Sequence, residues 1–141
     1  MFSEIIDHFA NRFTEKKIDK IIGIESRGFI FAAAIAAKMK IGFIPVRKPG
    51  KLPYKVEKIS YQLEYGSDSL EIHQDAVKPN ERVVIVDDVL ATGGTANATA
   101  ELVSRLGAEI IEISFLSELV FLKGREKIND FYSYSLASYS K

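Results

Sequence analysis

Segment 83–95, VVIVDDVLATGGT, constrains the fold of this chain more than any other. Its first four residues are apolar and β-branched, a pattern typical of a strand that is buried on both faces of a sheet. Two carboxylates, Asp87 and Asp88, follow where we expect that strand to end, and a loop of small residues precedes a helical pattern. Open α/β folds bind ligands at the carboxyl ends of parallel strands. This order therefore predicts a site for a sugar and its phosphate at such an edge.

The rest of the chain alternates between short apolar strands and helices. We expect helices over 2–16, 29–39, 95–106 and 120–128, and strands over 19–24, 41–46, 83–86, 109–115 and 131–136. Alternation on either side of Gly66-Ser67-Asp68 predicts a hairpin of strands 59–65 and 69–73, and the Gly- and Pro-rich stretch 47–58 reads as a loop. The pattern predicts an α/β fold: a mostly parallel, twisted sheet flanked by helices, in a single domain over residues 1–141.

The composition excludes several classes of protein. Lys plus Arg equals Asp plus Glu at 19 each, so no net field attracts nucleic acid or a membrane. The absence of Cys excludes disulfides, thiolate metal sites and a Cys nucleophile. The apolar run 28–37 is too short to span a bilayer, and the start of the chain lacks a signal-peptide pattern. We therefore expect a cytoplasmic protein without nucleic-acid or membrane partners.

The acidic pair has a plainer interpretation, which its neighbours outweigh. An isolated Asp-Asp is more often a helix cap beside a solvated residue than a binding site. Here small residues allow backbone N–H groups to converge on an anion at a helix N-terminus, and the Thr hydroxyls add donors. The carboxylates can then hold vicinal hydroxyls or a divalent cation. A P-loop NTPase and a dinucleotide-binding domain do not fit, because the Walker A Lys and the GxGxxG motif are both absent.

Segment 83–95 resembles the phosphoribosyl-diphosphate signature of type I phosphoribosyltransferases, and within them the chain resembles the adenine phosphoribosyltransferase family. Five further segments support this in family order: ESRGF at 25–29, RKPGKLP at 47–53, LEYG at 63–66, LEIH at 70–73 and LKGRE at 122–126. The resemblance implies a type I phosphoribosyltransferase fold with a reduced hood. It also implies a homodimeric purine-salvage enzyme that converts adenine and phosphoribosyl diphosphate to AMP and diphosphate with Mg²⁺.

The resemblance assigns the sugar-phosphate part of the site to the opening segment. Asp87 and Asp88 would hold the ribose hydroxyls, directly or through Mg²⁺, and act in catalysis. The loop would bind the 5-phosphate through backbone N–H groups and hydroxyls, with the residues Ala91, Thr92, Gly93, Gly94 and Thr95.

The resemblance assigns the diphosphate leaving group to two basic segments. Ser26 and Arg27 would contact it, since a planar guanidinium suits phosphate oxygens. Arg47, Lys48 and Lys51 would close over it as a mobile lid. Taken alone, Arg27 reads as a surface residue and the basic loop as a solvated one.

The base would lie between the hairpin and the end of a later strand. In the family the residue matching Glu64 lies near the purine imidazole nitrogens as a proposed acid/base, and the one matching Tyr65 contributes to closure. Leu119 matches a position that lines the base pocket. Without the resemblance these residues read as an exposed Glu, a packed Tyr and a core Leu.

One departure from the family and two rival readings qualify the assignment. Relatives carry an N-terminal segment with a Phe-Pro-x-Pro-Gly stretch and part of the hood, and residues 1–20 do not match it. We therefore expect ribose-phosphate binding to survive and adenine capture to be either weakened or remade from the partner subunit. One rival is a non-catalytic phosphoribosyl-diphosphate-binding or regulatory module. Regulatory proteins that contain such a module need a DNA-binding element, and this chain, with no net charge, shows none. The other rival is an enzyme for xanthine or hypoxanthine, against which the hairpin segment 63–66 favours adenine.

Overall fold

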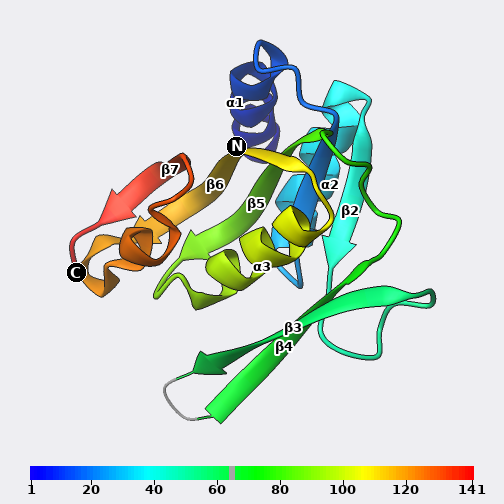
Figure 1. The fold of residues 1–141 in the computed structure, drawn as a ribbon. Coiled ribbons are helices and arrows are strands. Elements are labelled where there is room, and N and C mark those ends of the chain that lie inside the picture. Colours follow the sequence, from blue (N-terminus) through cyan, green and yellow to red (C-terminus); the bar gives the residue numbers. More distant parts are fainter. Residues whose placement is uncertain (64–65) are drawn as a thin grey trace.

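A five-stranded parallel sheet lies at the centre of the computed structural model, which describes residues 1–63 and 66–141 (Figure 1). Its strand order is β2-β1-β5-β6-β7, and every neighbouring pair is parallel. The strands are β1 (Lys20–Ile24), β2 (Gly42–Val46), β5 (Arg82–Leu90), β6 (Glu109–Leu119) and β7 (Ser133–Tyr139). The predicted α/β fold is confirmed.

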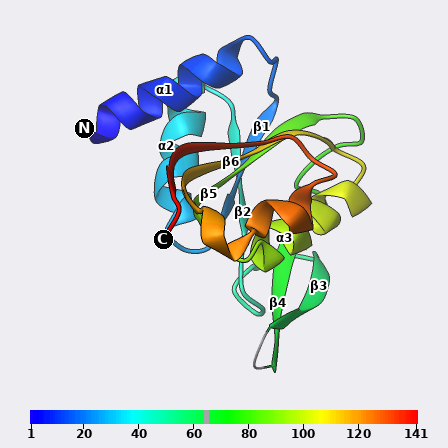
Figure 2. The ribbon, with the colours of Figure 1, turned by 90° about the vertical axis from the view of Figure 1, so that its left-hand side faces the viewer.

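Helices cover both faces of this sheet, as Figures 1 and 2 show. They are α1 (Phe2–Thr14), α2 (Gly28–Met39) and α3 (Gly94–Arg105). Val84 and Val86 of β5 belong to the core under α1 and α2, whereas Val83 and Ile85 belong to the core under α3. The uniformly apolar run of β5 follows from this burial on two faces. Within the described residues, the helices are all too short or too polar to cross a membrane.

A hairpin stands apart from the main sheet and extends below it in both views. Its strands are β3 (Val56–Leu63) and β4 (Gly66–His73). Buried Ile59 and Leu70 attach the hairpin to the core that contains α3. A short backbone bridge between Arg47 and Glu71 ties it to the end of β2. The hairpin is therefore held beside the carboxyl ends of the strands.

The strand order places a topological switch point between β1 and β5. The chain runs outward from β1 to β2 on one side and from β5 to β6 and β7 on the other. α2 follows β1 on one face, and α3 follows β5 on the opposite face. The loops after β1 and β5 therefore separate and leave a crevice, which is where α/β folds bind ligands.

Several predicted boundaries are wrong in an instructive way. The strand expected over 83–86 continues to Leu90, so Asp87 and Asp88 lie within β5 and not beyond it. Its partner β6 is also longer than expected and pairs with β5 as far as Leu90 and Glu118. Backbone pairing with the long strand β6 thus extends β5 through two Asp residues, although Asp has a low propensity for β-strands.

The remaining differences concern the hairpin and the C-terminal part. Gly66 pairs with Leu63 at the start of β4, so 66–68 belong to a strand and not to the turn, and β3 begins at Val56 within the expected loop. The helix expected over 120–128 is two 3₁₀ turns, η1 (Val120–Leu122) and η2 (Gly124–Ile128). The last strand is an edge strand, as expected, but it spans 133–139.

An ion pair fastens α1 to the sheet. Arg12 donates through Nε and Nη2 to the two carboxylate oxygens of Glu112 at 2.9 and 2.8 Å, and Lys16 Nζ lies 3.2 Å from the same group. The Glu112 side chain is 0% exposed. Burial alone would raise the pKa of Glu112, but the hydrogen bonds from Arg12 and Ser114 outweigh it and lower that pKa.

Removing Arg12 would leave the buried Glu112 charge poorly compensated. We expect Arg12→Ala to reduce the free energy of unfolding at pH 7 by roughly 3 kcal/mol. Lys38→Ala is the matched control, because Lys38 pairs with Asp7 at 3.3 Å between side chains that are both more than half exposed. Its effect should stay within about 0.5 kcal/mol. Urea unfolding of the three proteins measures the difference, and equal effects would contradict the anchoring role.

Candidate active site

A cleft of about 630 Å³ opens at the carboxyl ends of β1, β5 and β6. Five segments far apart in the sequence line it: the β1–α2 junction, the loop after β2, strand β4, the β5–α3 junction and the C-terminal half of β6. Its lining residues are Glu25, Ser26, Arg27, Lys48, Leu70, Phe115, Leu119 and residues 87–96. Most of the site residues predicted from the sequence therefore share one cavity.

The acidic pair meets the start of α2. Arg27 Nε lies 2.7 Å from Asp88 Oδ2. The backbone N–H of Asp88 donates to Asp87 Oδ1 at 2.9 Å. A Cβ atom on Gly28 would lie 2.7 Å from Asp87 Oδ1, so only glycine allows the helix to begin this close to the carboxylate. Both carboxylates thus reach the cleft although neighbouring strand residues point to opposite faces.

Among the described residues, the cleft gives only one of its two neighbouring carboxyl groups, that of Asp88, a cation as an ion-pair partner. Burial raises the pKa of Asp87 to about 8 despite the hydrogen bond from the Asp88 backbone, and the Asp88 carboxylate adds to the rise. The cation paired with Asp88 is Arg27, whose side chain is 74% exposed and therefore well screened by water. A cation or a group of hydroxyl donors beside Asp87 would favour its charged form.

The loop between β5 and α3 is built to receive an anion. Gly93, at the N-cap position of α3, has φ of +89°, in the left-handed region that favours glycine. Among the described residues no side chain caps this helix, so its first backbone N–H groups are available to a ligand. From the hairpin, the Tyr61 hydroxyl lies 3.2 Å from Thr95 Oγ1. Sequence reasoning missed Tyr61, which is one of several aromatic residues without a distinguishing motif.

The basic loop that was predicted to form a lid contacts a carboxylate, Glu25, to which the sequence analysis gave no role. Glu25 accepts hydrogen bonds from Arg47 Nε at 3.1 Å and from the Lys48 backbone at 3.0 Å, and it pairs with Lys51. Burial acts to raise the pKa of Glu25, but these three hydrogen bonds together lower it. The Lys48 side chain pairs with Asp68 of β4. The sequence held one signal for this cluster: an acid, Glu25, directly before Ser26, and three basic residues close together in the loop 47–51.

The predicted residues differ in their distance from the cleft. The cleft is lined by Ser26, Arg27, Lys48, the acidic pair, Leu119 and residues 91–95, which we call the phosphate loop after their predicted role. Arg47 and Lys51 do not line it but contact Glu25, which does. Glu64 and Tyr65 lie outside the residues that the structure describes.

Comparison with known proteins decides the family. The family model described as phosphoribosyl transferase domain matches residues 1–132. The adenine phosphoribosyltransferase of Acidobacterium capsulatum is 53% identical over 140 residues, which are 99% of this chain and 77% of that protein. The chain belongs to the adenine phosphoribosyltransferase family.

Solved structures of adenine phosphoribosyltransferases share the fold. The enzyme of Thermoanaerobacter pseudethanolicus is 50% identical with a TM-score of 0.94, over 98% of this chain and 80% of that chain. The enzyme of Saccharomyces cerevisiae, complexed with an imino-altritol bisphosphate and adenine, is 47% identical with a TM-score of 0.91, over 96% of this chain and 78% of that chain. The type I phosphoribosyltransferase fold predicted from the sequence is confirmed.

The buried Asp87 should make this phosphoribosyltransferase less stable as the pH rises. A carboxyl with a raised pKa in the folded state binds its proton more tightly there, so its contribution to stability is lost between about pH 4 and pH 8. We expect Asp87→Asn to be more stable than the wild type at pH 8.5, by on the order of 1–3 kcal/mol, and to lose this advantage near pH 4. Urea unfolding without ligands measures it. Asp75→Asn, at an exposed position, is the control, and a destabilised Asp87→Asn at pH 8.5 would contradict the assignment.

Proposed function

We propose that this chain transfers the ribose 5-phosphate of phosphoribosyl diphosphate to adenine, giving AMP and diphosphate. One observation carries the proposal: an incompletely balanced acidic pair and an uncapped, glycine-rich helix N-terminus share one cleft at the switch point of the sheet. These are the partners that a sugar and its phosphate require. The names and bound molecules of the relatives agree with this reading.

Each part of the donor has a counterpart in the cleft. The N–H groups of the loop 91–95 bind the 5-phosphate, favoured by the positive end of the α3 dipole. Asp87 and Asp88 accept hydrogen bonds from the ribose hydroxyls. Ser26 and Arg27 bind the diphosphate, and Arg47, Lys48 and Lys51 approach it from the lid.

Mg²⁺ fits this cleft as an ion brought by the substrate. Within residues 1–63 and 66–141 no group of three or more His, Asp or Glu side chains could hold a metal ion. Two carboxylates suffice when phosphate oxygens and water complete the octahedral shell, which is how Mg²⁺ is commonly bound. A cation bound beside Asp87 would lower its raised pKa and so favour the charged carboxylate that binds Mg²⁺. Bound through Asp87 and Asp88, Mg²⁺ would neutralise charge on the leaving diphosphate.

The proposed reaction is a substitution at the anomeric carbon of the ribose, in which negative charge develops on the departing diphosphate. A purine nitrogen forms a bond to the anomeric carbon while the bond from that carbon to the diphosphate oxygen breaks. Arg27 and the lid cations stabilise the negative charge that collects on the diphosphate. Closure of the lid keeps water from the sugar cation.

The base binds beside Leu119, a partly exposed apolar residue of the cleft lining, with the buried side chains of Leu70 and Phe115 packed behind that lining. Glu64 keeps its proposed role as acid/base at the purine, and Tyr65 its role in closure. We also expect a homodimer, which the mass of the protein in solution measures. A cytoplasmic location remains a prediction.

Product formation from different bases tests the proposed function. With phosphoribosyl diphosphate and Mg²⁺, we expect adenine to react at least about a hundred-fold faster than hypoxanthine, guanine or xanthine, because unpaired polar groups penalise the wrong base. The double variant Asp87→Ala/Asp88→Ala should lose about a hundred-fold or more in kcat/KM. Asp75→Ala, at an exposed position, is the control. Radiolabelled bases and chromatographic separation of nucleotides provide the readout.

Each rival has its own outcome in this assay. No product from any base, together with retained binding of phosphoribosyl diphosphate, would favour the non-catalytic module. Preferred product from xanthine or hypoxanthine would reassign the base. Full activity in the double variant would contradict the site assignment.

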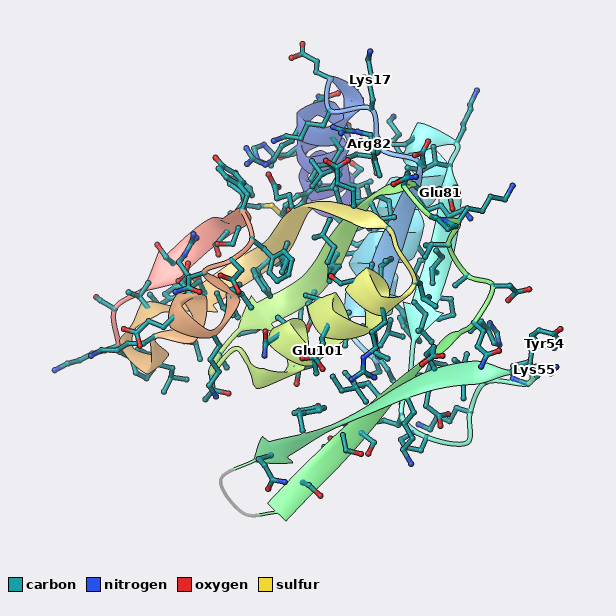
Figure 3. All side chains as sticks on the ribbon, viewed as in Figure 1. Lys17, Tyr54, Lys55, Glu81, Arg82 and Glu101 are labelled. Carbon is teal, nitrogen blue, oxygen red and sulfur yellow. The ribbon has the colours of Figure 1, made fainter. Side chains whose placement is uncertain are left out.

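The lid should affect one substrate and not the other. We expect Lys51→Ala to raise KM for phosphoribosyl diphosphate about ten-fold, because it removes a charged partner of a phosphate group. KM for adenine should change less than about two-fold. Lys55→Ala is the matched control, since Lys55 is exposed at the end of the hairpin where β3 begins (Figure 3). Steady-state kinetics with each substrate varied measures both constants, and equal changes in the two would contradict a diphosphate-specific lid.

A further inference from the structure

The segment LKGRE at 122–126 has no role in the site described so far, yet it lies directly against the phosphate loop. η2 begins at Gly124, after Lys123 in the left-handed conformation. A Cβ atom on Gly124 would overlap the carbonyl oxygen of Ala91 and lie 2.8 Å from Leu90 Cδ1. A Cβ atom on Gly93 would overlap the carbonyl oxygen of Gly124. The two backbones therefore touch through glycines on both sides, without room for a methyl group.

An ion pair next to Gly124, between Arg125 and Glu118, holds the backbone of η2 in place; we call it the Arg125 clamp. Arg125 Nε donates to both carboxylate oxygens of Glu118, at 2.8 and 2.9 Å. Arg125 Nη1 donates to the carbonyl oxygen of Ser133 at 3.2 Å and to its hydroxyl at 2.8 Å. Ser135 Oγ donates to Glu118 Oε1 at 3.0 Å. One guanidinium thus joins η2 to both β6 and β7.

The burial of Glu118 distinguishes this clamp from an ordinary surface ion pair. Exposed pairs contribute little, because water screens both charges. The Arg125 side chain is 47% exposed, but the Glu118 side chain is only 6% exposed. Removing Arg125 would leave a buried carboxylate without its charged partner, and η2 would shift or loosen. Such a shift would act on the phosphate loop, because Gly124 of η2 lies against the backbone of Ala91 and Gly93.

We propose that Arg125 is a positioning residue for the 5-phosphate site: its clamp on Glu118 holds Gly124 against Ala91 and Gly93 and so sets the geometry of the phosphate loop. The inference rests on the proposed function. Ser26 and Arg27, the proposed diphosphate contacts, follow β1 on the other side of the switch point. Loss of the clamp should therefore weaken ligands that carry the 5-phosphate and spare diphosphate itself.

Two ligands separate this role from a general structural one. We expect Arg125→Ala to weaken AMP binding at least about ten-fold, because small displacements of a binding group are costly. Binding of Mg²⁺-diphosphate should change less than about two-fold. Arg105→Ala is the matched control: Arg105 lies on α3 itself and pairs with Glu101 at 3.1 Å, between exposed side chains. Isothermal titration calorimetry measures both affinities, and thermal unfolding confirms that each variant is folded.

Arg125→Lys keeps the test decisive if Arg125→Ala does not fold. Lysine retains the charge beside Glu118 but cannot bridge β6 and β7 with a planar fork, so AMP binding should be partly restored. If a folded Arg125 variant keeps the AMP affinity of the wild type, or loses AMP and diphosphate affinity equally, the inference is overturned while the proposed function stands. A wild-type protein that binds neither ligand would instead contradict the proposed function, and the inference with it.

Discussion

The site depends on the close approach of α2 to the end of β5. Because Gly28 has no side chain, the first turn of α2 lies against Asp87, and Arg27 reaches Asp88 at 2.7 Å. The same approach removes water from Asp87 and raises its pKa to about 8. Near neutral pH the free protein thus holds Asp87 mainly as the neutral acid, whereas the unfolded chain would ionise it, and this costs stability that a ligand favouring the carboxylate can restore. Such local destabilisation is a common property of functional sites.

Opposite charges pair the cations around the proposed diphosphate site before a ligand arrives. Arg27 pairs with Asp88, Lys51 with Glu25 and Lys48 with Asp68. Cations gathered for a highly charged ligand would otherwise repel one another. Each pair is at least partly exposed on its cationic side, so an incoming phosphate competes with a carboxylate in a screened setting, where the exchange costs little. The acids therefore hold the lid close to the cleft without blocking it.

The sequence was informative where a residue acts through its neighbours in the chain and less so where it acts across the fold. The parallel sheet, the phosphate loop and the acidic pair follow from local patterns, and the structure places them together. The end of β5 could not be read from the sequence, because pairing with β6 decides it. Glu25 was missed for the same reason, since its partners arrive from another loop. The hairpin register was misjudged by reading Gly66 as a turn residue.

The phosphate loop shows why tertiary contacts complete what a local motif begins. Gly93 adopts a left-handed backbone conformation, which glycine tolerates best. Because it has no side chain, it also leaves room for the Gly124 carbonyl group. Two glycines distant in the sequence are therefore coupled, because a side chain at either one would push the two backbones apart. Small residues in a phosphate loop are usually explained by the ligand alone. Here the protein itself also requires them, so the loop geometry is set by the fold before any phosphate binds.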